Sequence, residues 1–244
     1  MTTTEPAPIS LQPLGIIHTP YKQKFAIPRQ PGLVSEAIGE IRFFSPFNDI
    51  NCFRGIEQFS HLWLLFRFHQ VQERGWKPTV RPPRLGGNQR VGVFASRSTH
   101  RPNGLGLSVV EFVSLKTDKG QVSLQVRGMD LLDGTPIVDI KPYLPYADAH
   151  PGAAGGFASQ APQPVPVRFS ADAMIQLEQL SPEPDKMQRL IQAVLAQDPR
   201  PAYKSSQSRP QSFAIRLDNL NIHWQSEQNR IEVVGIENIC AEKA

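Results

Sequence analysis

The sequence is poor in cysteine, in long apolar runs and in glycine-rich nucleotide-binding patterns. Its two cysteines, Cys52 and Cys240, have no Cys or His neighbour at metal-ligand spacing, so we expect neither a metal site nor a disulfide scaffold. Residues 1–8 are polar, and the longest apolar run, Leu62–Phe66, is far too short to span a bilayer. These absences predict a protein of the reducing cytoplasm, with no membrane contact and no metal.

Proline, by contrast, is abundant: the chain of 244 residues contains 23, well above the average usage of about 5%. Each proline inside a helix costs roughly 3 kcal/mol, so this density excludes an all-helical bundle. The hydrophobic fraction of 40% excludes a disordered chain. The composition therefore favours short strands joined by turns and by long ordered loops.

Basic residues gather in one stretch, although the formal net charge is only +4. Residues 74–101 contain seven lysines and arginines and no acidic residue, so the rest of the chain is slightly acidic. A charge run is often only a solvated surface. Here the basic residues alternate with Pro, Gly and aromatic residues, which suits a shaped anion-binding surface better than a helix face. This stretch predicts a phosphate-rich partner.

Short apolar segments separated by Pro and Gly predict a β-rich N-terminal part. We expect strands at residues 15–18, 41–44, 61–68, 91–95, 107–113, 122–126 and 137–140. About seven or eight short strands without a helical period are typical of a closed or nearly closed β-barrel. The intervening segments 20–39 and 75–92 are long, and long loops in a compact domain are usually functional.

The character of the sequence changes after residue 150. Residues 151–166 are rich in Ala, Gly and Pro and predict a linker or a wrapping loop. Ser170 can cap a helix over residues 171–180, and an apolar stripe within 187–195 predicts a second helix. Antiparallel strands are expected at 212–217, 221–225 and 231–236. The predicted fold class is mostly β, with a small β-barrel domain in residues 1–150 and a small α+β domain in 167–244.

Four loop segments carry unusual residue combinations. They contain Pro28-Arg29-Gln30, Phe68-His69-Gln70, Arg101-Pro102-Asn103-Gly104 and Asp130-Leu131-Leu132-Asp133-Gly134. With the C-terminal segment Asp198-Pro199-Arg200-Pro201-Ala202-Tyr203, they resemble the TrmO (TsaA-like, YaeB-like) family of S-adenosylmethionine-dependent tRNA methyltransferases. The family usually has proline where this chain has Gly104, which leaves the geometry of that turn open.

The resemblance implies a non-Rossmann β-barrel methyltransferase that works as a homodimer, with the cofactor near the subunit interface. It implies methylation of N6 of threonylcarbamoyladenosine at position 37 of the tRNA anticodon loop, typically in a threonine tRNA. By the same resemblance, the contacts to S-adenosylmethionine are Pro28, Arg29, Gln30, His69, Gln70, Arg97, Leu107, Asp130, Leu131, Leu132, Asp133 and Gly134.

The chain offers no glycine-rich strand–loop–helix unit, so an S-adenosylmethionine pocket must be built from loops. Either Arg29 or Arg97 suits the carboxylate of the cofactor. Leu107 and the Leu131-Leu132 pair suit its adenine, and the nearby carboxylates and amides suit its ammonium group or ribose. Each of these residues can also have a purely structural role. For example, Asp133-Gly134 taken alone is typical of a turn.

The tRNA partner requires cationic and aromatic contacts. We expect these from Arg81, Arg84, Arg90, Arg101, Arg200 and Tyr203. The residue that takes the proton from N6 is not assigned by the sequence, and the candidates are His69, Asp133 and Tyr203. Two alternatives remain open: a non-catalytic RNA-binding barrel, and a methyltransferase of another RNA or of a small substrate.

Overall fold

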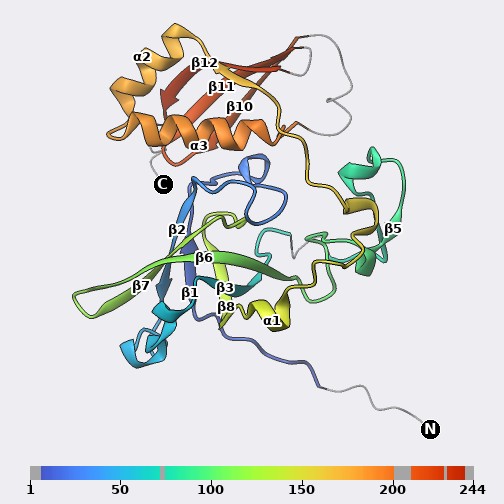
Figure 1. The fold of residues 1–244 in the computed structure, drawn as a ribbon, viewed down its shortest axis with the longest axis vertical. Helices are drawn as coiled ribbons and strands as arrows, with labels where there is room; N and C mark the ends of the chain where they lie inside the picture. Colours follow the sequence, from blue (N-terminus) through green and yellow to red (C-terminus); the bar gives the residue numbers. More distant parts are fainter. Residues whose placement is uncertain (1–6, 72–74, 201–209, 228–229, 240–244) are drawn as a thin grey trace.

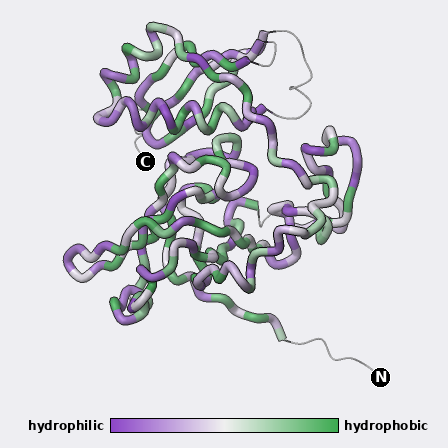
Figure 2. Tube along the Cα trace, viewed as in Figure 1, coloured by the Kyte–Doolittle hydropathy of each residue, from purple (hydrophilic) through white to green (hydrophobic). Residues whose placement is uncertain are grey.

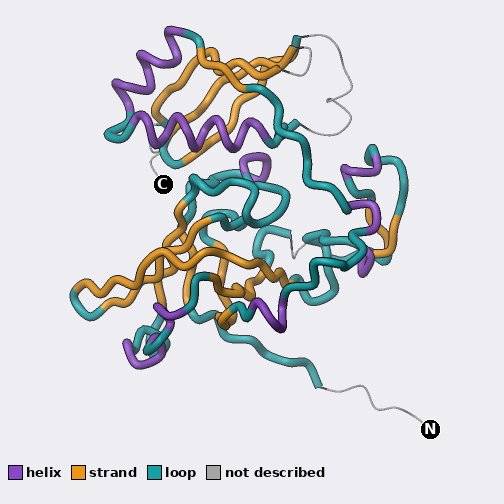
Figure 3. The backbone as a smooth tube through the Cα atoms, viewed as in Figure 1, coloured by secondary structure: helices purple, strands orange, loops and turns teal. Residues whose placement is uncertain are grey.

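The computed structural model describes residues 7–71, 75–200, 210–227 and 230–239. A β-barrel forms one part and an α+β region lies above it in the view of Figure 1. A long segment after the barrel runs up one side and joins the two parts, mostly as loop (Figure 3). Among the described residues, no helix is both long enough and apolar enough to cross a membrane.

Six antiparallel strands close the barrel in the order β1-β2-β7-β6-β3-β8. Their bounds are β1 Gly15–His18, β2 Ile38–Phe43, β3 His61–Arg67, β6 Leu105–Asp118, β7 Gln121–Arg127 and β8 Thr135–Pro142. Side chains alternate across each strand, as in β3, where Leu62, Leu64 and Phe66 are buried and the residues between them are half-buried. The predicted β-barrel is confirmed.

One expected barrel strand is not in the barrel. Within residues 91–95 only β5 (Val91–Gly92) is a strand, and it pairs with β4 (Thr79–Val80) in a separate two-stranded ribbon. The next three residues form a 3-10 turn. Val93 is buried there, whereas Phe94 is 78% exposed. The segment has a strand-like composition, but it lies outside the closed barrel.

We call residues 75–95 the arm, because they project from the barrel beside β5 in Figure 1. Its outer part is largely hydrophilic (Figure 2). Short helical turns mark the loops of the described residues: α1 Pro145–Asp148 and the 3-10 turns Lys24–Ala26, Ile50–Phe53, Ile56–Gln58, Pro83–Leu85, Val93–Ala95 and Gly156–Ala158.

The register of the barrel strands brings three loops to one end of the barrel. His18 pairs with Glu40, Ile17 with Thr135, and Arg67 with Leu105. The loops 19–37, 68–104 and 128–134 therefore leave the barrel from the same rim, which we call the loop end.

Gly106 allows a close approach at this rim. A Cβ atom at this position would lie 2.4 Å from the ring of Phe66 and 2.9 Å from the ring of Phe68. The two rings meet edge to face, with their centroids 5.2 Å apart. Glycine therefore lets β6 pass directly over the aromatic end of β3, which fixes the start of β6 beside the segment that carries His69.

The C-terminal region is a four-stranded sheet packed against two helices. Its elements are β9 Val167–Phe169, α2 Ala171–Leu180, α3 Pro184–Ala196, β10 Gln211–Leu217, β11 Leu220–Glu227 and β12 Arg230–Asn238. The strand order is β10-β11-β12-β9, with β9 parallel to β12. The Ser170 hydroxyl accepts a hydrogen bond from the Ala173 amide at 3.2 Å, which confirms the predicted cap.

The turn between β10 and β11 contacts the loop end of the barrel. The Asp218 amide donates to the Pro20 carbonyl at 2.9 Å, and Tyr21 forms a backbone bridge with Leu217. Tyr21 and Leu217 are fully buried and belong to the same hydrophobic core. The C-terminal region is therefore anchored on the rim that carries the three loops.

Candidate functional site

The loop end contains the residues that the family resemblance assigns to the cofactor. They come from the three loops of this rim and from the first residues of β6: Pro28, Arg29, Gln30, His69, Gln70, Arg97, Leu107 and residues 130–134. Residues far apart in the sequence thus share one rim because the strands that carry them are antiparallel neighbours.

One group of polar residues surrounds Asp130. The Ser108 hydroxyl donates to Asp130 Oδ1 at 2.6 Å, and Arg97 donates to the side-chain oxygen of Gln30. Burial raises the pKa of the Asp130 carboxyl, while the Ser108 hydrogen bond and the Arg97 charge oppose this rise. We call Gln30, Arg97, Ser108 and Asp130 the Asp130 corner.

A second group surrounds Asp133, only three positions further along the chain. Asp133 Oδ1 accepts from the Thr19 amide at 2.9 Å, and Oδ2 lies 2.9 Å from Lys22 Nζ. His18 Nδ1 lies 3.7 Å from Oδ1. Burial alone would raise the pKa of this carboxyl, but the bonds from Lys22 and Thr19 outweigh burial and hold it below its usual value. We call His18, Thr19, Lys22 and Asp133 the Asp133 corner.

Backbone bonds fix the turn that carries both carboxylates. The Asp133 amide donates to the Tyr21 carbonyl and the Gly134 amide to the Ile17 carbonyl, each at 3.0 Å. The Thr19 hydroxyl donates to the Leu131 carbonyl at 3.0 Å. Asp133-Gly134 is thus a turn, and Gly134 has a φ of 77°, which glycine adopts without strain. Asp133 joins this turn to the segment after β1.

The leucine pair of this turn divides between the core and the surface. Leu131 is 1% exposed and belongs to the hydrophobic core, whereas Leu132 is half-buried. Leu107 is 54% exposed beside Ser108. Leu107 and Leu132 therefore offer apolar surface to a ligand, while the side chain of Leu131 is already covered by the protein.

His69 and Gln70 follow the end of β3. The His69 imidazole is half-buried and Gln70 is exposed. Burial lowers the pKa of His69, and the nearby charge of Asp133 opposes that change. The imidazole is therefore held in its neutral form at neutral pH, and a neutral imidazole can accept a proton.

Arg29 contacts the C-terminal region. Its Nη2 donates to the Asp198 carbonyl at 3.3 Å. Of the two arginines expected to bind the cofactor carboxylate, Arg97 is therefore the one close enough to Asp130 to influence its pKa. Pro28 is buried just before Arg29.

The arginines expected to contact RNA fall into two sets. Arg81, Arg84 and Arg90 are exposed on the arm, and none of them forms an ion pair with another described residue. Arg101 instead donates to the carbonyls of Ser96 at 2.7 Å and Val93 at 3.3 Å, so it holds its own loop together.

Arg200 is also bonded to another residue of the protein. It is 5% exposed and forms a two-point ion pair with Asp198, with nitrogen–oxygen distances of 2.6 and 2.8 Å. In this conformation its guanidinium faces the protein rather than a partner. Tyr203, the other RNA contact expected from this segment, lies outside the described residues.

Sequence reasoning missed Ser108 and Tyr21. A serine within the apolar run of β6 was the available signal for Ser108, which is 3% exposed. The Tyr21 hydroxyl is buried without a hydrogen-bond partner among the described residues. Burial, and then the charges of Asp130 and Glu36, raise the pKa of Tyr21, so its phenol stays neutral beside the Asp130 corner. In the sequence, no feature comparable to the serine in an apolar run marks Tyr21 as part of the site.

No group of three or more metal-ligating side chains occurs among the residues that the structure describes. The functional groups of the loop end are instead carboxylates, guanidinium groups, amides and one imidazole. Such a set can hold a charged small molecule by hydrogen bonds, and it can accept a proton at the imidazole.

The comparisons with known proteins cover both parts of the chain. Residues 16–149 match the family model described as the tRNA-methyltransferase O N-terminal domain, and residues 162–239 match the TrmO C-terminal domain. The Escherichia coli protein named tRNA (adenine(37)-N6)-methyltransferase is 48% identical over 225 residues, covering 92% of this chain and 96% of that protein.

A curated protein and a solved structure from Pseudomonas aeruginosa are also similar. The protein, named provisionally as an S-adenosylmethionine-dependent methyltransferase, is 45% identical over 88% of this chain and 91% of its own length. The crystal structure of TrmO from this organism superimposes with a TM-score of 0.79 at 37% identity, covering 95% of this chain and 99% of that one. With both family models matched and this fold shared, the chain belongs to the TrmO family of tRNA methyltransferases.

Proposed function

We propose that this protein transfers a methyl group from S-adenosylmethionine to N6 of threonylcarbamoyladenosine at position 37 of a tRNA, with threonine tRNA as the expected substrate. The name of the Escherichia coli relative supports the tRNA position and the acceptor nitrogen. The observation that carries the proposal is the Asp130 corner, where a half-buried carboxylate, a guanidinium and an exposed leucine meet at one rim.

The residues of this rim fit the cofactor. The amino-acid end of S-adenosylmethionine has a carboxylate and an ammonium group, which suit Arg97 and Asp130 respectively. Arg97 is exposed and bonds only to the neutral Gln30 among the described residues, so its charge is available to an anion. Leu107 offers apolar surface to the adenine. These residues would hold the cofactor.

S-adenosylmethionine, when bound, supplies an electrophilic methyl group on a sulfonium centre. The protein must align the acceptor nitrogen with that methyl group, and alignment is the main source of rate in such a displacement. The backbone bonds of the 128–134 turn and the Ser108 hydrogen bond hold the rim rigid for this purpose.

N6 of a carbamoylated adenine carries a proton that must be removed. Of the three candidates, His69 suits this role because burial keeps its imidazole neutral. Both carboxylate oxygens of Asp133 are already engaged by Thr19 and Lys22. We therefore infer that His69 accepts the proton, while Asp133 maintains the turn.

The arm is the proposed tRNA contact. Arg81, Arg84 and Arg90 present exposed guanidinium groups to the phosphate backbone. Trp76 is 52% and Phe94 78% exposed on the same arm, so both can stack on unpaired bases. The exposed arginines and aromatic rings thus combine the two kinds of contact that RNA loops require.

A second copy of the chain would complete the site. Arg97 is exposed and Leu107 is 54% exposed, so the Asp130 corner is open to solvent on the side where these two residues lie. The homodimer implied by the family resemblance would cover this side, and a tRNA-modifying enzyme is expected in the cytoplasm.

Labelled S-adenosylmethionine and tRNA that carries the threonylcarbamoyl group test the proposal directly. We expect a labelled, methylated threonylcarbamoyladenosine, and no label in the same tRNA prepared without that group. Arg84→Ala should weaken tRNA binding and lower its salt slope by about one unit, with cofactor binding unchanged. Absence of labelled nucleoside with a folded protein contradicts the proposal. If calorimetry then detects no heat when S-adenosylmethionine is added, a non-catalytic RNA-binding barrel is favoured.

A further inference from the structure

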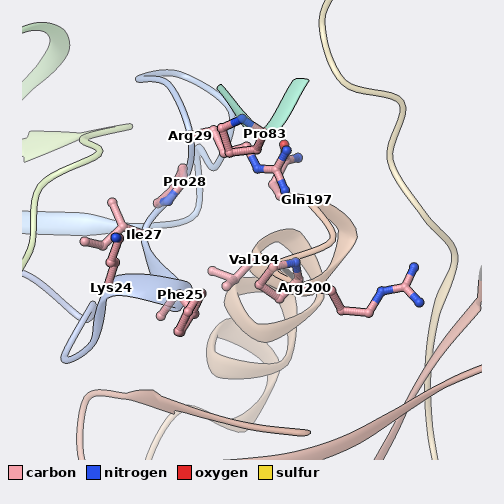
Figure 4. A pocket seen from close by; sticks show the side chains of 11 residues that line it. Lys24, Phe25, Ile27, Pro28, Arg29, Pro83, Val194, Gln197 and Arg200 are labelled. Carbon is pink, nitrogen blue, oxygen red and sulfur yellow. The ribbon is translucent and has the colours of Figure 1, made fainter. Parts of the chain in front are cut away.

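A small cleft lies between the barrel and the end of α3. Its volume is about 190 Å³, and its walls include Phe25, Ile27, Val194 and Pro199 (Figure 4). Sites for drug-sized ligands typically have about 300–1,000 Å³, so this cleft suits a fragment the size of a single ring system. Its apolar walls come from both parts of the molecule, which makes it distinct from the Asp130 corner.

An unused hydrogen-bond acceptor lies in this cleft. The side-chain oxygen of Gln197 is buried and has no hydrogen-bond partner among the described residues. A buried acceptor without a donor is unfavourable, and since Gln197 lines the cleft, a turn of its amide toward the cleft would let a ligand N–H group satisfy it. Gln197 directly follows α3, and its own amide donates to the Val194 carbonyl at 3.2 Å, which fixes its backbone.

The rim of the cleft is cationic. Lys24 and Arg29 line it, and Arg84 follows Pro83, which also lines it. The neighbouring acid, Asp198, has both carboxylate oxygens bonded to Arg200 and so offers little attraction to a cation. The cleft therefore combines an apolar slot, one acceptor and positive charge at its mouth.

An exposed aromatic ring completes this arrangement. Phe25 is 54% exposed although it lies on a 3-10 turn whose neighbour Ala26 is buried. Exposed aromatic rings beside cations are the common platform for unpaired bases of RNA, because a base stacks on the ring while its phosphates meet the cations.

We propose that this cleft binds one unpaired nucleobase of the tRNA, at a position other than the methylated adenosine. The base stacks on Phe25, an N–H group of the base donates to the Gln197 side-chain oxygen, and the flanking phosphates lie near Lys24 and Arg29. This inference rests on the proposed tRNA substrate. It gives the contact between the two parts of the molecule a role in recognition that is separate from methyl transfer.

Two variants test the proposal in the full-length protein. Phe25→Ala removes the stacking surface, and Gln197→Met removes the acceptor at similar side-chain length. We expect Phe25→Ala to raise the Kd for tRNA about tenfold and Gln197→Met to raise it by a smaller factor. For both, the KM for tRNA rises, whereas kcat at saturating tRNA and the Kd for S-adenosylmethionine stay unchanged. Phe44→Ala is the matched control, since Phe44 is 45% exposed at the opposite end of the barrel.

An anticodon stem–loop RNA with 2-aminopurine at each loop position in turn identifies the bound base. One position should change its fluorescence with the wild-type protein and with Phe44→Ala, but not with Phe25→Ala. The proposal is overturned if Phe25→Ala and Gln197→Met both bind tRNA as tightly as Phe44→Ala. If the wild-type protein binds tRNA without methylating it, the proposed function fails while the base-binding cleft is still tested by the same variants.

Discussion

Asp130 and Asp133 lie in the same turn at the loop end of the barrel, but their surroundings act on the carboxyl group in opposite directions. Asp130 is half-buried and accepts a hydrogen bond from the Ser108 hydroxyl, and burial raises its pKa. Asp133 has an amide and an ammonium group on its two oxygens, and these lower its pKa despite burial. Both oxygens of the Asp133 carboxylate are therefore bonded within the fold, while the Asp130 carboxylate can still bind a ligand.

This difference assigns separate tasks to the two corners. The Asp133 corner stabilises the turn, because its bonds all lead back to residues 18–22 of the same barrel. The Asp130 corner holds a destabilised charge that a cationic ligand group can compensate. Variants at each corner should therefore separate loss of folding from loss of cofactor binding.

The largest effect is expected for Asp133→Ala. It leaves the Thr19 amide and the Lys22 ammonium without their partner, so we expect a loss of about 2–3 kcal/mol in the free energy of unfolding. Methylation should fall as well, because the turn then loses the hydrogen bond and the ion pair that hold it to residues 19–22. Denaturant unfolding measures the change, and Asp139→Ala, an exposed aspartate on β8, serves as the control.

The stability difference of Asp133→Ala should also depend on pH. Because the folded pKa of Asp133 is lowered, its stabilising contribution is present above the unfolded pKa and is lost as the pH falls through the folded pKa. The difference in the free energy of unfolding between the wild type and Asp133→Ala should therefore become smaller at acidic pH. Equal stability of Asp133→Ala and Asp139→Ala near neutral pH would show that the Asp133 corner does not stabilise the turn.

A smaller, ligand-specific effect is expected for Asp130→Asn. It removes the charge proposed to meet the cofactor ammonium, so affinity for S-adenosylmethionine should fall at least about tenfold. Since the folded pKa of Asp130 is raised, wild-type affinity should increase as the pH rises through that pKa, and the variant should lack this step. Calorimetric titrations from acid to neutral pH measure both. A variant with wild-type affinity and an unchanged pH profile would exclude Asp130 as a ligand.

Asp130→Asn should affect stability in the opposite sense to Asp133→Ala. A carboxyl with a raised folded pKa contributes stability below its unfolded pKa and loses it as the pH rises through the folded pKa. Replacing it with a neutral amide therefore removes a cost at neutral pH. Greater loss of stability in Asp130→Asn than in Asp133→Ala would reverse the comparison of the two corners.

The smallest effect is expected for Ser108→Ala. The hydroxyl lowers the pKa of Asp130 against burial, so its removal should shift the pH profile of cofactor binding to higher pH. The change in affinity near neutral pH should be a few-fold, and stability should fall by about 1 kcal/mol. Thr79→Ala, at an exposed position of the arm, is the control. An unshifted profile would show that Ser108 does not tune Asp130.

Local signals in the sequence predicted much of the fold. The Ser170 cap predicted α2 at 171–180, and the apolar stripe within 187–195 predicted α3, because both signals are properties of neighbouring residues. Residues 91–95 were expected as a barrel strand and are not, because pairing depends on a neighbour that local composition does not reveal. Leu131 and Leu132 look alike in sequence, yet only the first enters the core.

The candidate site was predictable as a set of segments but not as a set of contacts. The motifs named the loops, and the antiparallel register placed them on one rim. Charge alone could not distinguish the exposed Arg84 from Arg200, because the difference lies in the ion pair with Asp198. Likewise, the opposite environments of Asp130 and Asp133 depend on Ser108 and Lys22, which are distant in sequence.

The bridge between Tyr21 and Leu217 has a consequence for the newly made chain. The barrel strands end at Pro142, so the barrel can close while the ribosome is still adding the C-terminal region. Pro20 and Tyr21 receive their bonds from residues 217 and 218 only when that late hairpin has emerged. The rim that carries the Asp133 turn is thus completed later than the barrel, and a chain cut before residue 217 would have a closed barrel with an unfinished rim.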